Sequence, residues 1–296
     1  MIRYATAGAF KQALETRLRS ASSSGVDFAR RRQLLVFDRF LARIARQFGE
    51  QVILKGGIVV ELRLERARTT KDIDLRLVGA PERVPDHLKA ATALDLGDFM
   101  RFDVSPDAEH PEITSEGMLY EGQRYRVACS LAGKPYGQPF GLDVAFADPI
   151  FGEPDVVVAD DVLGFAGIEP PSLRVYPLET HIAEKLHAYT MPRKRPNSRV
   201  KDLPDLALLA SVREIDGGPL RSALEQTFAS RKMQPLPTAL PEPPADWTPR
   251  YARMANEDEL RWSDLGELTR AVRAFLDPVL AGAPRTWRPQ AWRWRE

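Results

Sequence analysis

The sequence lacks several features that mark particular classes of protein. Only one of its 296 residues, Cys129, is a cysteine, which excludes an intramolecular disulfide framework and a cysteine-rich zinc site. No apolar run approaches the roughly 20 residues of a membrane helix, and the N-terminal segment holds no uninterrupted apolar stretch. We therefore expect no membrane segment, no secretory signal and a cytoplasmic location.

An excess of charge of one sign is also missing. The chain has 42 Lys and Arg residues against 41 Asp and Glu residues, so any argument for a nucleic-acid partner must rest on local patches. What the chain does have is a hydrophobic content of 44%, which is enough to bury a substantial core. Its length suits one large domain or two lobes.

The hydrophobic pattern changes from mixed to helical along the chain. Residues 30–48 predict an amphipathic helix that has Leu34, Phe37 and Leu41 on its inner face and arginines on its outer face, and that ends at Gly49. Strands are predicted at 51–55 and 69–78 and within DFMRFDV, RYRVACSLA and PFGLDVAFA. From about residue 176 the patterns are helical. We predict an α/β lobe at 1–150 and a mainly helical lobe at 151–296.

Residues 54–75, LKGGIVVELRLERARTTKDIDL, combine a glycine turn with two close aspartates. Asp72 and Asp74 point to the same side of a strand, where like charges repel, so we expect a divalent cation to compensate them. In GLDVAF, Asp143 points away from the apolar face. If the two strands are neighbours, the three carboxylates converge on one or two Mg²⁺ ions, and Gly56 and Gly57 let backbone amides approach a phosphate.

Each of these residues also has a structural interpretation. A lone D-x-D is more often a solvated edge strand, and only its combination with the glycine turn and Asp143 favours a metal site. Lys185 lies beside an inward-facing helical stripe and could reach nucleotide phosphates, although an exposed lysine is the commoner case. His181 and His187 are interpreted as structural or solvent-facing. Asp202 and Asp205, taken alone, favour helix capping and interaction with the helix dipole.

Basic and aromatic residues indicate two candidate surfaces for RNA. A cluster beside the Asp202 motif suits RNA phosphates: Arg193, Lys194, Arg195, Arg199 and Lys201. All five tryptophans lie beyond residue 246, and for the tail TWRPQAWRWRE we favour packing onto the helical lobe over base stacking. Arg63, Arg66 and Arg68 lie near the glycine turn, where contact with a nucleotide and solvent exposure are equally plausible.

Five motifs in order resemble the AbiEii/AbiGii-type nucleotidyltransferase toxins, the MenT-like toxins of toxin–antitoxin systems. They are LKGG (54–57), R-x-T-x-D-I-D (68–74), LDVAF (142–146), EKLHA (184–188) and VKDLPDL (200–206), and similarity continues through 247–254 and 271–280. The resemblance implies a polymerase-β-like nucleotidyltransferase lobe and a helical C-terminal lobe. Gly57 replaces the serine that many members of the wider superfamily have after the first strand.

The resemblance also implies roles for particular residues. Asp72 and Asp74 would bind Mg²⁺ or Mn²⁺, with Asp143 as a third carboxylate, and Lys55, Lys185 and Arg68 would contact the NTP. We favour Asp202 over Asp205 as the functional acid of its motif.

The expected function is that of a toxin that transfers NMP to the 3′ end of tRNA and blocks aminoacylation. A cognate antitoxin is expected, and the toxin itself is expected to be a monomer. The alternative keeps the fold but changes the acceptor to a protein hydroxyl or a small molecule such as an aminoglycoside. A degenerate, non-enzymatic binding protein is disfavoured because the acidic residues are all present.

Overall fold

The computed structural model describes residues 4–64, 70–79, 83–113, 122–146, 149–193, 197, 199–283 and 285–295. The helices are α1 (Ala7–Ser20), α2 (Gly25–Phe48), α3 (Gly57–Arg63), α4 (Val84–Thr92), α5 (Leu178–Thr190), α6 (Asp202–Ala210), α7 (Gly217–Arg231), α8 (Thr248–Glu257) and α9 (Leu265–Leu280). None of the helices in these ranges is both long and apolar enough to cross a membrane.

Strands from both parts of the chain build one mixed sheet. The strands are β1 (Val52–Lys55), β2 (Asp72–Leu77), β3 (Met100–Pro106), β4 (Gly122–Leu131), β5 (Lys134–Pro135), β6 (Phe140–Phe146), β7 (Asp155–Val158), β8 (Ser172–Val175), β9 (Ile215–Asp216), β10 (Thr286–Arg288) and β11 (Arg293–Trp294). The main sheet has the order β3-β4-β6-β2-β1-β8-β7, with β5 added beside β4. Its β2–β6 and β1–β8 pairs are parallel, and β9 to β11 form a second, small sheet.

Helix α2 begins and ends where local chemistry requires it. The Ser24 hydroxyl accepts a hydrogen bond from the Asp27 amide (3.1 Å) at the N-terminus, and Gly49 at φ 54° ends the helix. Phe37, Leu41 and their neighbours are buried against the sheet, which confirms the helix predicted at 30–48. The helix begins earlier than predicted, at Gly25.

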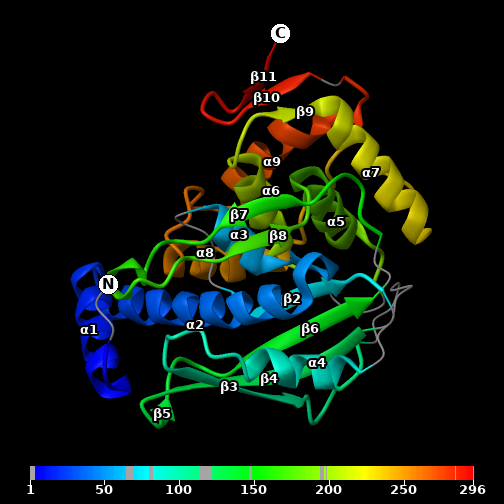
Figure 1. Ribbon diagram of the computed structural model, residues 1–296. Coiled ribbons are helices and arrows are strands. Elements are labelled where there is room, and N and C mark those ends of the chain that lie inside the picture. The colour runs from blue at the N-terminus through cyan, green and yellow to red at the C-terminus, as the bar shows by residue number, and fades with distance from the viewer. Residues whose placement is uncertain are drawn as a thin grey trace.

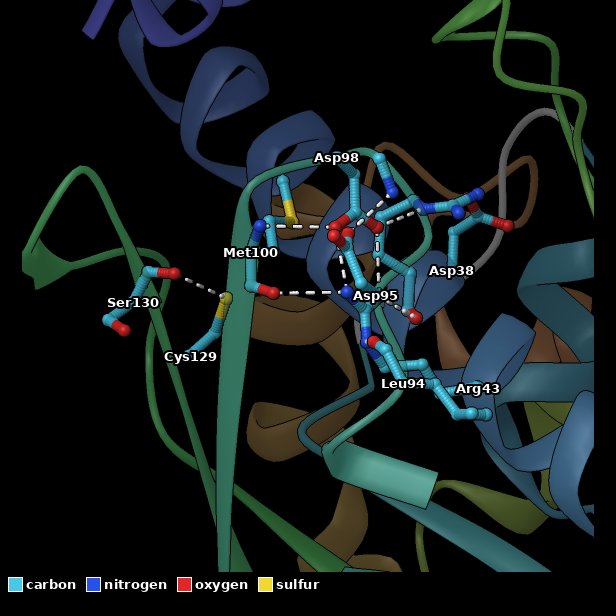
Figure 2. Close-up of polar contacts among 10 residues, drawn as sticks. Asp38, Arg43, Leu94, Asp95, Asp98, Met100, Cys129 and Ser130 are labelled. Carbon is cyan, nitrogen blue, oxygen red and sulfur yellow. Dashed lines mark hydrogen bonds and ion pairs between the residues drawn. The ribbon is translucent and has the colours of Figure 1, made fainter. Parts of the chain in front are cut away.

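Two of the α2 arginines are buried, so their predicted exposure is wrong. Arg39 and Arg43 are 3% and 1% exposed because both bind Asp98, which is fully buried at the entry to β3. Arg43 donates to both Asp98 oxygens (2.8 and 2.7 Å), and Arg39 Nε donates to Oδ2 (2.9 Å). Figure 2 shows Asp98, Arg43 and the Met100 backbone in this network. Burial alone would raise the pKa of Asp98, but the hydrogen bonds from Arg43 and Arg39 outweigh it and hold that pKa below its usual value.

The buried apolar side chains form two clusters. The first lies between α1, α2, α4 and the main sheet and includes residues as late as Val175. The second holds α5 to α9 with the small sheet, from Leu178 onward, and also includes Val60 of α3. Figure 1 shows the C-terminal helices gathered at one end of the molecule and β3, β4 and β6 at the other. Strands β7 and β8 therefore belong to the main sheet although they follow residue 150, and we propose a lobe boundary near Tyr176 instead.

Candidate functional site

Four charged side chains lie in one row across the main sheet. Lys55 of β1 is the register partner of Asp74, Asp74 is the partner of Asp143 on β6, and Asp143 is the partner of Arg124 on β4. Partners in register project from the same face of a sheet. Ile73 and Leu75 point the other way and are fully buried in the first cluster. The side chains of β2 alternate between the two faces of the sheet, so its apolar residues are buried and its aspartates project from the other face, as predicted.

The carboxylates of β2 each lie against a glycine. Gly56, which precedes α3, has φ 72°, and a Cβ at this position would overlap Asp74 Oδ2. A Cβ on Gly141, the partner of Asp72, would lie 2.6 Å from Asp72 Oδ1. A side chain at either position would displace a carboxylate, so both glycines make room for the acidic pair.

The environment of Asp74 opposes its ionisation. Burial raises the pKa of the Asp74 carboxyl, and the Asp143 and Asp72 carboxylates raise it further, whereas Lys55 and Lys185 lower it. The two lysines come from β1 and α5, so strands and helices of both hydrophobic clusters contribute charge at this carboxylate. The Lys55 ammonium also lies 5.8 Å from the centre of the Tyr176 ring.

Lys185 joins the sheet to the K-D-x-x-D-L motif of α6. Its ammonium lies 3.2 Å from Asp202 Oδ1 and 2.7 Å from Asp205 Oδ2, and all three side chains are largely buried. No side chain caps α6 through a hydrogen bond, so the capping interpretation of Asp202 is wrong. Within the described part of the chain, Asp202 Oδ2 is buried without a hydrogen-bond partner.

The two aspartates of β2 fit a divalent metal better than the predicted triad does. Arg124 engages both oxygens of Asp143 (2.7 and 2.8 Å). Among the residues that the structure describes, no three His, Cys, Asp or Glu side chains are grouped to hold a metal ion. Asp72 and Asp74 nevertheless share a strand face and lie in glycine-lined space. Since Mg²⁺ takes a few carboxylates and completes its shell with water and substrate phosphates, this pair suits it.

The segment directly before Asp72 is held in place by Glu61, a residue that the sequence did not indicate. Glu61 on α3 accepts a hydrogen bond from the Thr70 amide (2.5 Å) and another from Arg30 of α2 (3.2 Å), which fixes the chain directly before Asp72. Arg63 is also structural, because it is bound to Asp155 (2.6 Å) and to the Tyr176 carbonyl (2.8 Å). The predicted nucleotide ligand Arg68, with Arg66, lies outside the described residues.

The predicted RNA-binding cluster is only partly described. Arg193 donates to the Ala188 carbonyl (3.2 Å), and Arg199 and Lys201 are exposed, whereas Lys194 and Arg195 lie outside the described residues.

His181 and His187 are both buried, so neither faces solvent.

The tryptophan tail packs onto the helical lobe, as favoured from the sequence. The indole nitrogens of Trp287, Trp292 and Trp294 donate to backbone carbonyls of α6 and α9.

Comparison with known proteins identifies relatives of this arrangement. A family model described as nucleotidyl transferase AbiEii toxin of type IV toxin–antitoxin systems matches residues 39–295. The solved structure of MenT4, a nucleotidyltransferase toxin from Mycobacterium tuberculosis H37Rv, is 17% identical with a TM-score of 0.54, covering 92% of this chain and 98% of that chain. JHP933 from Helicobacter pylori is 15% identical with a TM-score of 0.46, covering 83% and 94%. No curated protein matches the sequence. The likeness to MenT4 confirms the predicted nucleotidyltransferase fold.

Proposed function

We propose a function for this chain, which belongs to the AbiEii family of nucleotidyl transferase toxins of type IV toxin–antitoxin systems. In this proposal it transfers NMP from an NTP to the 3′ end of tRNA. Such a transfer would block aminoacylation and hence translation. The observation that supports this proposal best is the position of Asp74, which lies between Lys55 and Asp143 in the sheet and within the electrostatic reach of Lys185.

The proposed chemistry distributes roles among the residues of the site. The acceptor hydroxyl loses its proton to water and attacks the α-phosphorus, the bond to the oxygen that bridges to the β-phosphate breaks, and pyrophosphate leaves with the bonding electron pair. Lys55 and Lys185 provide fixed positive charge for the triphosphate, and Arg68 is assigned to the same task from its motif. A Mg²⁺ or Mn²⁺ ion held by Asp72 and Asp74 would neutralise developing charge and acidify the hydroxyl.

The α6 carboxylates position the lysine in this scheme. Asp202 and Asp205 both contact the Lys185 ammonium and so keep a buried cation charged and directed toward Asp74. We assign the functional role to Asp202, whose second oxygen has no hydrogen-bond partner among the described residues. Asp143 is assigned an indirect role through its pairing with Arg124.

The biological setting follows from the proposed substrates. A toxin that consumes NTP and modifies tRNA acts in the cytoplasm, and its family implies a cognate antitoxin encoded nearby. We propose that the toxin acts as a monomer, since every residue assigned above belongs to one chain.

A transfer assay tests the proposed function. Purified protein, Mg²⁺ and each α-labelled NTP in turn are incubated with tRNA, a protein mixture or an aminoglycoside. We expect labelled tRNA, and we expect Asp72→Ala and Asp74→Ala to reduce labelling by at least about 100-fold while thermal unfolding is unchanged. Label on protein or aminoglycoside alone would instead establish the alternative acceptor.

The matched control is Asp103→Ala, which removes an exposed carboxylate from β3 of the same sheet. It should label tRNA at the wild-type rate. Near wild-type transfer by Asp72→Ala or Asp74→Ala would refute the assignment of the metal-binding pair.

A further inference from the structure

A large cavity opens beside Asp72. Its volume is about 1030 Å³, and it lies between the first half of α2, the starts of β2 and β6, and the end of α8. Asp72 lines the cavity, whereas Lys55, Gly56, Asp74 and Lys185 do not. Asp72 therefore belongs both to the lining of the cavity and to the candidate metal pair, whereas the groups assigned to the triphosphate lie outside the lining.

The sheet side of the cavity carries positive charge next to Asp72. Arg126 and Asp72 are both register partners of Gly141, so they share a sheet face two strands, or about 10 Å, apart. Gly141 has no side chain, and the Asp72 carboxylate lies within 2.6 Å of where its Cβ would be. Lys71 directly precedes Asp72, and both Lys71 and Arg126 are exposed and line the cavity. These two cations lie on either side of Asp72, one of the two carboxylates beside which the acceptor hydroxyl would have to bind in the proposed transfer.

The other walls of the cavity carry charge of both signs, because Arg30, Arg31 and Arg32 of α2 line it beside Asp27. The Gln33 side chain of α2 donates to the Gln138 carbonyl (3.1 Å) and accepts from its amide (2.7 Å), which holds the turn that precedes β6. The end of α8, residues 257–259, contributes three carboxylates opposite the sheet. These carboxylates would repel a phosphate backbone and direct it toward the basic residues of α2 and the sheet.

We propose that this cavity binds the 3′-terminal nucleotides of the acceptor RNA, with Arg126 and Lys71 contacting backbone phosphates and the terminal hydroxyl placed at Asp72. The inference rests on the proposed function and names its acceptor subsite. The volume of about 1030 Å³ lies at the upper limit of the roughly 300–1,000 Å³ of small-molecule pockets, which leaves room for more than one nucleotide. Single-stranded 3′ ends are also the parts of RNA that proteins can enclose.

RNA affinity measured without NTP tests the subsite separately from the reaction. Fluorescently labelled tRNA is titrated with wild-type protein and with the Arg126→Ala/Lys71→Ala double variant at several salt concentrations. Each phosphate contact in a single strand adds about 0.7 to the slope of log affinity against log salt, so the variant should lose about 1.4 from the slope. Its affinity should fall about 10-fold or more, and its affinity for NTP should not change.

Two comparison variants make the result specific. Arg101→Ala removes an exposed arginine from β3 of the same sheet, outside this cavity, and should leave both the slope and the affinity unchanged. Arg199→Ala/Lys201→Ala tests the basic cluster predicted from the sequence. A loss of RNA affinity there, with wild-type affinity in Arg126→Ala/Lys71→Ala, would overturn the cavity proposal.

The outcomes also separate this inference from the proposed function. If the wild type labels tRNA and the double variant binds tRNA like the wild type, the cavity assignment is wrong and the tRNA transferase proposal stands. If the wild type neither binds nor labels tRNA, both are wrong.

Discussion

At the scale of single residues, the site depends on where side chains are missing as much as on where they are present. Gly56 and Gly141 each occupy a position whose Cβ would collide with an aspartate of β2. The sequence predicted a glycine turn here, because Gly-Gly follows an apolar strand, but it assigned the turn to a phosphate and not to the space beside Asp74. It did not predict the role of Gly141, because that residue matters only through its register with Asp72.

We predict that Gly56→Ala abolishes transfer. The new methyl group would displace the Asp74 carboxylate, and the positive φ adds backbone strain, so we expect at least about a 100-fold loss of activity in the transfer assay.

Gly97 provides a matched control, because it has the same φ of 72° but nothing within 4 Å of an added Cβ. Gly97→Ala should cost about 1 kcal/mol of stability and keep its activity. Equal loss of activity in both variants would attribute the effect to backbone strain alone.

Arg124 is the site residue that sequence reasoning missed. In GQRYRVACSL, Arg124 and Arg126 alternate with buried Tyr125 and Val127, so their exposure could be read from the pattern. Their position opposite Asp143 and Gly141 could not, because the pairing of β4 with β6 joins segments that are separated in the sequence by a turn. The same limit explains the misread arginines of α2, whose partner Asp98 lies on a different element.

At the scale of elements, α5 carries both Lys185, the proposed triphosphate ligand, and a buried histidine. Burial, with help from the charges of Arg231 and Arg193, lowers the pKa of His187 to about 4, and the ring packs edge-on against Phe228 at 4.9 Å. An unfolded histidine has a pKa near 6.5. Between about pH 6.5 and pH 4, His187 is therefore protonated in the unfolded chain and neutral in the folded chain.

We predict that this element loses stability in acid because of His187. Since the unfolded state takes up more protons in that window, the stability contributed by neutral His187 falls as pH decreases from about 6.5 to 4, by about 2 kcal/mol. Urea unfolding at pH 7.5 and pH 4.5 should show a smaller acid loss in His187→Gln than in the wild type. His110→Gln, at an exposed position, should behave like the wild type, and an identical acid loss in His187→Gln would contradict the prediction.

At the scale of the whole molecule, one carboxylate connects the two hydrophobic clusters. Asp155 of β7 accepts from Arg63 at the end of α3 (2.6 Å) and from the Leu178 amide at the start of α5 (3.2 Å). Because α5 carries Lys185, this contact helps to set the position of that lysine relative to Asp74. The sequence predicts two lobes divided at residue 150, but β7 and β8 pair within the main sheet after that position, which no local pattern indicates.

We predict that Asp155→Ala lowers the free energy of unfolding by roughly 1–3 kcal/mol, because it leaves the largely buried Arg63 without this partner and removes an acceptor from α5. Transfer should fall together with stability, since α5 loses an anchor.

Urea unfolding and the transfer assay would measure both effects. Asp246→Ala breaks an exposed pair with Arg250 (4.0 Å) and should cost less than about 1 kcal/mol without affecting transfer. Equal stability losses in the two variants would show that the Asp155 contact does not hold the clusters together.

The placement of the tryptophans makes the protein its own spectroscopic reporter. All five, Trp247, Trp262, Trp287, Trp292 and Trp294, belong to or pack against the second cluster, and the first cluster has none. Intrinsic tryptophan emission therefore reports on the helical half alone, while far-ultraviolet circular dichroism reports on both halves. If the two signals change at the same denaturant concentration, the halves unfold as one cooperative unit, and a gap between the midpoints would measure how independent they are.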